Sequence, residues 1–129
     1  MVSGRASGTV MRLDEALSFC GGVDEVSGEI IDRRHPQLGS SITGSVLTLP
    51  AGRGSSSSSS VLAETIRRGT GPAAIVLGRT DHILAVGALV AEELYRKNCP
   101  VVVVGSEEYE RLRNGAEVEV QLDGTIFFQ

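Results

Sequence analysis

Two uninterrupted apolar runs in the second half of the chain predict buried strands. They are residues 73–77, Ala-Ala-Ile-Val-Leu, and residues 101–104, four consecutive valines. Strands covered on both faces read as continuous apolar runs rather than as alternation. The residues between them carry apolar positions at helical spacing: Ile83, Val86, Gly87, Val90 and Leu94. This spacing predicts a helix that Asp81 caps and that residues 98–100 end, and the strand–helix–strand order predicts a right-handed βαβ unit with parallel pairing.

The remaining pattern predicts shorter elements. Loose alternation predicts a strand over residues 3–13, and a second strand is expected over 42–49. Residues 14–17 are compatible with one helical turn, and residues 29–32 with a short extended segment. Ser106 is expected to cap a short helix that ends at Asn114-Gly115. Apolar positions alternate on either side of an Asp123-Gly124 turn, which predicts a C-terminal hairpin: Val118, Val120 and Leu122 before the turn, Ile126 and Phe128 after it.

A glycine- and serine-rich stretch, residues 52–60, lies between the strand that ends at Leu49 and a helix expected to begin near Val61. Four positions of that helix share one face: Val61, Leu62, Thr65 and Ile66. Arg67 and Arg68 suit its last turn, and Gly69 its C-terminal cap. Glycines let the backbone turn sharply and let a ligand approach, and free N–H groups at a helix start attract anions. The stretch therefore predicts a site for a small anion, with Arg53 as a cationic fork beside a serine hydroxyl.

A flexible linker is the alternative interpretation of the same stretch, because Gly/Ser tracts are usually solvated. The tract lies directly against apolar runs on both sides, and the residues before it would make a poor domain of their own. We therefore predict an ordered strand–loop–helix turn within one domain that comprises residues 1–129.

Composition narrows the function classes. The chain has 41% hydrophobic and 22% charged residues and a net charge of -4, which is typical of a globular protein and speaks against nucleic-acid binding. No apolar run is long enough to span a membrane, and the N-terminus lacks a signal pattern, so a cytoplasmic location is expected. Cys20 and Cys99 have no CxxC partner and are expected to be free thiols. We predict no metal site in this chain.

Two loops hold further candidates. A turn at Gly21-Gly22 would bring Asp24 and Cys20 toward a common side, although a purely structural turn is the favoured interpretation of these residues. His35 precedes a proline in a loop rich in polar donors. It is a candidate acid–base or substrate-binding group because imidazole titrates near neutrality; the alternative is an ordinary loop histidine.

Several short motifs together resemble the small subunit, or swivel domain, of aconitase X dehydratases. They are Phe19-Cys20-Gly21-Gly22-Val23-Asp24, Arg34-His35-Pro36, Ile42-Thr43-Gly44 and Gly52-Arg53-Gly54-Ser55-Ser56, and the similarity continues through 72–76 and 91–94. The resemblance implies a swivelling β/β/α fold of mixed α/β class, with a barrel-like β half beside the βαβ layer. It also implies a large catalytic subunit as partner, which carries the iron–sulfur cluster.

The resemblance further implies that Ser55 is the catalytic base, by similarity to the Gly-x-Gly-Ser-Ser loop of ordinary aconitase. Ordinary aconitase has an arginine after the two serines, whereas this chain continues with Ser57–Ser60, so its anion recognition must differ. The substrate-binding candidates are Arg53, Gly54, Ser56, Ser57 and His35.

Two substrates occur in the family. Bacterial members resemble cis-3-hydroxy-L-proline dehydratases, which form Δ1-pyrroline-2-carboxylate, and archaeal members resemble mevalonate 5-phosphate dehydratases. The serine-rich loop favours the bacterial substrate. A third hypothesis is a non-catalytic swivel module that binds a larger partner without supplying a base.

Overall fold

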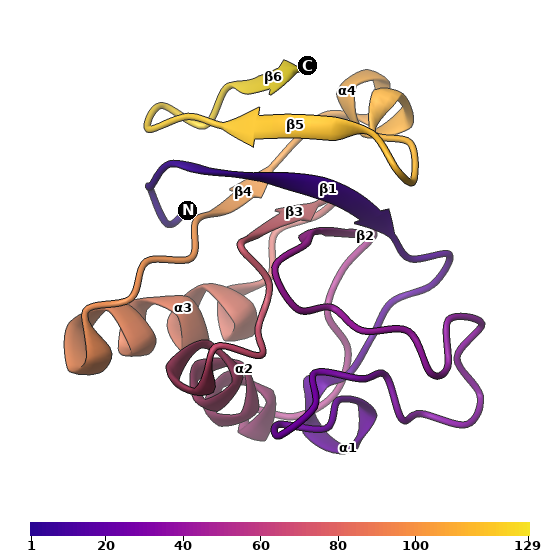
Figure 1. Cartoon of the computed structure of the whole chain (residues 1–129), viewed down its shortest axis with the longest axis vertical. Coiled ribbons are helices and arrows are strands. Elements are labelled where there is room, and N and C mark those ends of the chain that lie inside the picture. The colour runs from indigo at the N-terminus through magenta and orange to yellow at the C-terminus, as the bar shows by residue number, and fades with distance from the viewer.

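A six-stranded sheet with the strand order β4-β3-β2-β1-β5-β6 organises the computed structural model, which describes residues 1–129. The strands are β1 (Ala6–Arg12), β2 (Val46–Leu49), β3 (Ala74–Leu77), β4 (Val101–Val103), β5 (Glu117–Val120) and β6 (Ile126–Phe128). The helices are α1 (Phe19–Gly22), α2 (Ser57–Arg68), α3 (His82–Tyr95) and α4 (Ser106–Arg111). Helices α2 and α3 lie on one side of the sheet (Figure 1).

The first four strands of the chain pair in parallel, and β5 and β6 add an antiparallel edge. The predicted parallel β3–α3–β4 unit is confirmed, and β2–α2–β3 forms a second unit of the same kind. The N-terminal strand β1 does not belong to a separate β half. It pairs with β2 on one side and β5 on the other, and so lies within a single mixed sheet.

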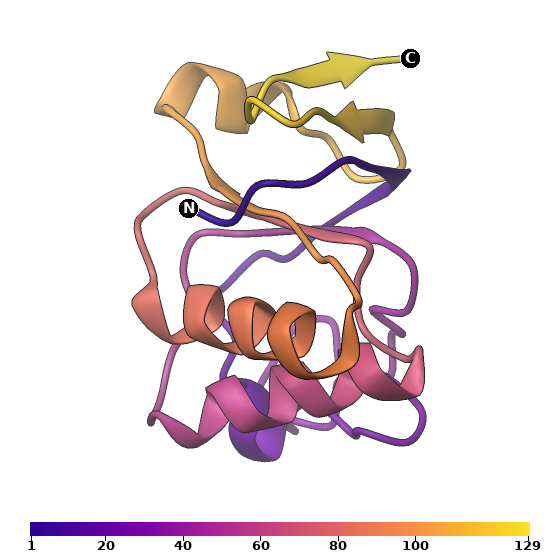
Figure 2. The same cartoon turned by 90° about the vertical axis from the view of Figure 1, so that its left-hand side faces the viewer.

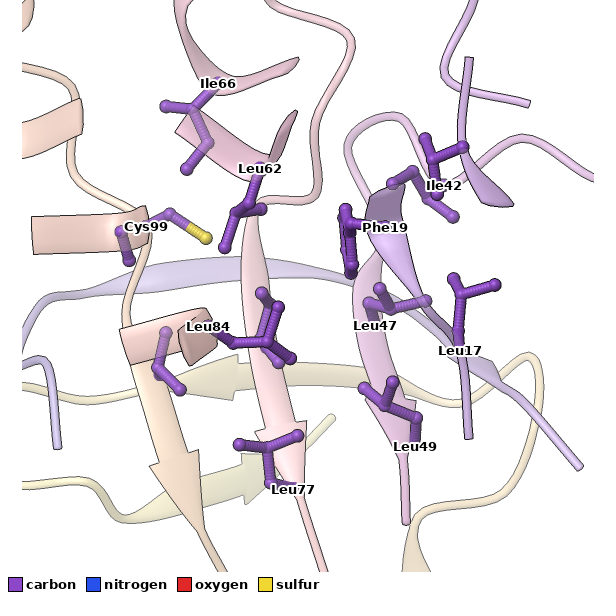
Figure 3. Packing of buried hydrophobic residues seen from close by; sticks show 14 of the residues in the cluster. Leu17, Phe19, Ile42, Leu47, Leu49, Leu62, Ile66, Leu77, Leu84 and Cys99 are labelled. Atoms are coloured by element: carbon purple, nitrogen blue, oxygen red, sulfur yellow. The ribbon is translucent and has the colours of Figure 1, made fainter. Parts of the chain in front are cut away.

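The sheet curls, so that β5, β6 and α4 lie over the face opposite α2 and α3 (Figures 1 and 2). Successive strand side chains point to opposite faces, which divides the buried residues between two clusters. Leu47, Leu49 and Leu77 pack with Leu62 of α2 and Leu84 of α3, as Figure 3 shows, and Ile75 belongs to the same cluster. The opposite cluster contains Val46, Val76, Val102, Val118, Val120 and Ile126. The predicted mixed α/β class with a barrel-like half is confirmed by this curled sheet.

The start of α2 differs from the prediction. The helix begins at Ser57, not near Val61, so the last four serines are helical. Its C-terminal end matches the prediction, with basic residues in the last turn and Gly69 in the left-handed conformation. The early start follows from packing, because Ser58 is buried with the apolar face of α2.

Other boundaries also shift. Residues 14–17 form no helical turn, and residues 29–32 contribute only isolated bridges at Glu29 and Ile30. Strand β2 begins four residues later than predicted, because 42–45 turn before entering the sheet. Helix α4 is capped by Gly105 rather than Ser106 and ends at Arg111.

The apolar positions that predicted α3 do not form its buried face. Of those five residues only Gly87 is buried, and Val86 and Leu94 are 48% and 65% exposed. The residues that face inward are instead mostly small: Leu84, Ala85, Gly87, Ala88 and Ala91. Small residues let α3 approach α2 closely. A Cβ added at Gly87 would lie only 2.7 Å from the carbonyl oxygen of Ser59.

We predict that Gly87→Ala destabilises the protein, although alanine is the better helix former by about 1 kcal/mol. The methyl group would meet backbone rather than a movable side chain, so α2 and α3 must separate, at a cost of about 1–3 kcal/mol. Urea unfolding measures the change. Leu89→Ala, on the exposed side of the same helix, is the control and should stay within about 0.5 kcal/mol. A stabilising Gly87→Ala would contradict the close packing.

Candidate active site at the glycine-serine loop

A small cleft opens where strands β2 and β3 end. It has a volume of about 180 Å³, and its walls come from four segments of the chain. They contribute Leu17, then Gly52, Arg53 and Gly54, then Ser58, and finally Asp81, Ile83 and Leu84. The carboxyl ends of parallel strands are the usual place for ligands in α/β proteins. The glycine-serine stretch predicted as a site thus forms one wall of the cleft.

The backbone of this stretch, called below the glycine-serine loop (residues 52–56), is fixed at two points. Leu17 and Gly52 form a parallel bridge, in which the Arg53 N–H donates to the Leu17 carbonyl at 3.1 Å. Gly54 has φ 101°, and a Cβ placed there would lie 2.5 Å from the Ser18 Oγ. The tract is therefore an ordered turn packed on the 17–18 segment, as predicted, rather than a linker.

Four successive backbone N–H groups, those of Gly54, Ser55, Ser56 and Ser57, donate to no protein acceptor. They lie at the N-terminal end of α2, where the helix dipole is positive. Ser56 occupies the cap position in helical geometry and forms no side-chain cap, so no serine hydroxyl neutralises this end. The arrangement can bind a small anion, or stabilise an oxyanion, through consecutive N–H groups.

Ser55 lies in the middle of this group. Its side chain is exposed and its hydroxyl has no hydrogen-bond partner in the chain, while its carbonyl accepts from the Ser58 N–H at 3.0 Å. Ser56 and Ser57 are exposed as well, whereas the Ser59 hydroxyl turns back to the Ser56 carbonyl at 2.7 Å. Of the serines, Ser55 presents its hydroxyl directly after the sharp turn at Gly54.

Ser58, itself buried, belongs to a partly buried hydrogen-bond network that the sequence pattern did not predict. Its Oγ accepts from the Cys20 N–H at 3.1 Å and lies 3.5 Å from the Ser18 Oγ, and the Ser18 hydroxyl donates to the Cys20 carbonyl at 3.0 Å. These bonds fasten α1 to the first turn of α2. The signal was present, because Ser58 and Leu62 are four residues apart on the face that carries Thr65 and Ile66.

Two charged residues line the cleft: Arg53, within the glycine-serine loop, and Asp81, before α3. The Arg53 guanidinium lies 4.0 Å from an Asp32 carboxylate oxygen, and both side chains are partly exposed, so this pair contributes little stability and leaves the guanidinium available. On the other side, Asp81 caps α3 by accepting from the Leu84 N–H at 3.0 Å, as predicted. Its second oxygen, Oδ2, lies against Gly52 and leaves no room for a side chain there.

The remaining candidates occupy structural positions. His35 is buried; its Nδ1 accepts from the Gln37 N–H at 3.1 Å and its Nε2 lies 3.3 Å from the Glu15 carbonyl, so both ring nitrogens are engaged within the chain. Asp24 accepts from the Val26 and Ser27 N–H groups of its own turn. Both placements favour the structural interpretation over a site role. Cys20 is exposed on α1, next to Gly21 with φ 80°.

The chain's own residues do not fit an iron–sulfur cluster. No three His, Cys, Asp or Glu side chains gather as ligands, and clusters ordinarily take four protein ligands. Cys20 and Cys99 are both free thiols, and Cys99 is buried among apolar side chains. Burial raises the pKa of the Cys99 thiol to about 12, so it is not the thiolate that metal binding requires.

Residues 1–128 match the family model of the aconitase X swivel domain. The chain belongs to this family. As an aconitase X swivel domain it is 48% identical to a cis-3-hydroxy-L-proline dehydratase of Pseudomonas aeruginosa, over 87% of this chain but only 19% of that relative. It is 40% identical to the phosphomevalonate dehydratase small subunit of Methanothermobacter thermautotrophicus, over 97% of this chain and 92% of that one.

Among solved structures, this swivel domain is similar to the aconitase X of Thermococcus kodakaraensis in its holo-form. The TM-score is 0.85 at 31% identity, over 99% of this chain and 92% of the other. The comparison confirms the predicted swivel fold. The chain thus spans about a fifth of the Pseudomonas dehydratase and nearly all of the archaeal small subunit.

No helix in it combines the length and apolar composition that crossing a membrane requires.

Proposed function

We propose that this swivel domain is the small subunit, or the equivalent domain, of an aconitase X hydro-lyase, and that Ser55 is the base of its dehydration. One observation carries the proposal. The Ser55 hydroxyl is exposed and unpartnered, directly follows Gly54 of the cleft wall, and lies within a row of four free backbone N–H groups. Relatives named as dehydratases support the reaction class.

The free N–H groups can stabilise the negative charge that Ser55 must carry to act as a base. A serine hydroxyl is a very weak acid, so its alkoxide must be stabilised before it can accept a proton. The free N–H groups of Gly54–Ser57 and the positive end of α2 supply fixed dipoles for that purpose. They become effective when a partner closes the cleft and excludes water, because electrostatic interactions strengthen in a dry site.

In the proposed reaction, Ser55 removes a proton from the carbon next to the one that carries the hydroxyl group. The electron pair of the broken C–H bond forms the carbon–carbon double bond as the hydroxide departs. The proton taken by Ser55 is later released, so the net change is loss of one water. Because this chain offers no ligand set for a cluster, we assign the iron–sulfur cluster implied by the family, and activation of the leaving group, to the large partner.

The substrate is proposed to be cis-3-hydroxy-L-proline. Loss of water across C2 and C3 gives the enamine Δ2-pyrroline-2-carboxylate, which becomes the imine Δ1-pyrroline-2-carboxylate when the ring nitrogen loses its proton and C3 gains one. Its carboxylate suits the Arg53 guanidinium and the free N–H groups of Gly54, Ser56 and Ser57; of these residues Arg53 and Gly54 line the cleft. The bacterial relative named for this substrate is 48% identical, against 40% for the archaeal phosphomevalonate relative. The cleft of about 180 Å³ also suits a small ring better than a longer phosphorylated chain.

The test is turnover by the complex of this chain with the large aconitase X subunit from the same organism. We expect loss of cis-3-hydroxy-L-proline with formation of Δ1-pyrroline-2-carboxylate, and no turnover of mevalonate 5-phosphate under the same conditions. Each subunit alone is the control and should be inactive. The reverse preference would assign the chain to the second substrate, and no turnover of either would contradict the hydro-lyase assignment.

A further inference from the structure

We infer that the outer side of α3 is a docking surface for the large aconitase X subunit, continuous with the rim of the cleft. This surface, called below the outer α3 face, consists of Val86, Leu89, Val90, Leu94 and Tyr95. The inference rests on the proposed function, because it takes the partner from that proposal. It adds a place and a chemistry for the contact that neither the family nor the names of the relatives specify.

The outer α3 face has the composition of a buried surface. Leu89 is 50% exposed and Leu94 65% exposed, and the segment 83–91 contains no charged or hydrogen-bonding side chain. A helix that is apolar on all sides is normally covered on all sides. The view in Figure 2 looks onto α3, and no other element of the chain lies in front of it.

The neighbouring helix α2 shows that the fold does not impose this composition. On its outer side Glu64 pairs with Arg67 and Arg68 at 2.7 Å, as expected for a helix in water. The two helices pack against each other and against the same sheet, yet only α3 presents large aliphatic side chains outward. Packing within the chain uses Leu84 and the small residues of α3, so its exposed large side chains contribute little inside this domain.

The position of the outer α3 face identifies the occupant. Ile83, in the first turn of α3, lines the cleft, and Val86 and Val90 follow at helical steps of three and four residues. The apolar surface therefore starts at the cleft and runs along the helix, which is about 21 Å long. Near its far end the helix carries exposed charges, Glu92, Glu93 and Arg96, as at the polar rim of an interface. A partner that closes the cleft would therefore also cover the outer α3 face.

The size of the missing partner agrees with this assignment. The Pseudomonas relative contains this domain in only 19% of its length, so the other four-fifths of that chain is large enough to cover an extended surface of the domain. A stable interface takes about 800 Å² from each side, which the glycine-serine loop alone is too small to supply. The outer α3 face would provide the apolar centre of such an interface, and the loops around the cleft its polar edge.

The experiment measures the affinity of the full chain for the large subunit by titration calorimetry. Leu89→Lys and the double variant Val86→Lys/Leu89→Lys place a strong helix former at exposed positions, so the isolated chains should keep their melting temperatures. We expect Kd to rise at least about tenfold for Leu89→Lys and further for the double variant. Leu122→Lys, which is 61% exposed in the β5–β6 turn, is the matched control and should leave Kd unchanged.

Wild-type affinity in both α3 variants would overturn the inference. Self-association of the wild-type chain that Leu89→Lys abolishes, with unchanged affinity for the large subunit, would also overturn it, because the occupant would then be a second copy. The proposed function fails in a different way. If the wild-type complex forms and the α3 variants weaken it, but the complex dehydrates neither substrate, the docking surface stands and the hydro-lyase assignment falls.

Discussion

Ser55→Ala should lower the single-turnover rate of the assembled enzyme by about 10²–10⁴-fold or more, since it removes the group proposed to take the proton. The folded chain should not be affected. The Ser55 hydroxyl is exposed and bonds to nothing in the chain, so the unfolding free energy should change by less than about 0.5 kcal/mol. Affinity for the large subunit should stay close to that of the wild type, which separates a catalytic loss from a failure to assemble.

An alanine series across residues 55–60 shows which serine is the base. Ser60→Ala is the control, because Ser60 is exposed on α2 and lies beyond the row of free N–H groups, which ends at Ser57. Ser58→Ala should instead lower stability more than turnover: it removes the acceptor of the partly buried Cys20 N–H, at a cost of about 0.5–1.5 kcal/mol. If Ser56→Ala or Ser57→Ala shows the large rate loss and Ser55→Ala only a small one, that other serine is the base. No large loss anywhere would favour the non-catalytic swivel module.

The sequence predicted the strands that are buried on both faces, since a short continuous apolar run such as 73–77 is typical of such a strand. It did not predict where β1 lies in the sheet. That position depends on pairing between residues far apart in the chain, such as Val10 with Val46 and Thr9 with Glu117, and local alternation carries no information about such partners. The order of strands therefore emerged only from the structure.

The orientation of α3 was mispredicted for a different reason. Residues 83–91 are apolar at every position, so helical periodicity is compatible with several faces and cannot select one. Side-chain size decides the outcome: Gly87, Ala88 and Ala91 allow the close approach to α2 that Val86 and Leu94 would prevent. A uniformly apolar helix beside a site is itself a sequence signal that a second surface has to be covered.

In the candidate site, the sequence indicated the glycine-serine loop and Arg53 but not what holds them in place. The partly buried hydrogen bond from the Cys20 N–H to Ser58 requires two segments 38 residues apart to meet, and no local sequence pattern indicates it. The same limit applies to His35. Its residue type suggested chemistry, whereas the structure engages both of its ring nitrogens with Glu15 and Gln37.

Gly54→Ala should lower the turnover rate by about 10²-fold without removing any catalytic group, because a displacement of about 1 Å is enough for such a loss. Gly54 has φ 101°, and its missing side chain leaves space that the Ser18 Oγ occupies: an added Cβ would lie 2.5 Å from that oxygen and 3.2 Å from the Ser18 Cβ. Alanine must therefore shift the loop away from the 17–18 segment. Ser55 and the row of N–H groups would move with it.

The control separates displacement of the site from backbone strain. Gly115 has a similar φ of 90°, and a Cβ there would meet no atom within 4 Å, so Gly115→Ala introduces the strain of a positive φ alone, about 1–2 kcal/mol. Gly115 lies before β5 and does not line the cleft. Rates and melting temperatures of both variants, measured in the assembled enzyme, should show a comparable loss of stability but a loss of turnover only for Gly54→Ala. Equal rate losses would mean that overall stability, and not the position of Ser55, limits the reaction.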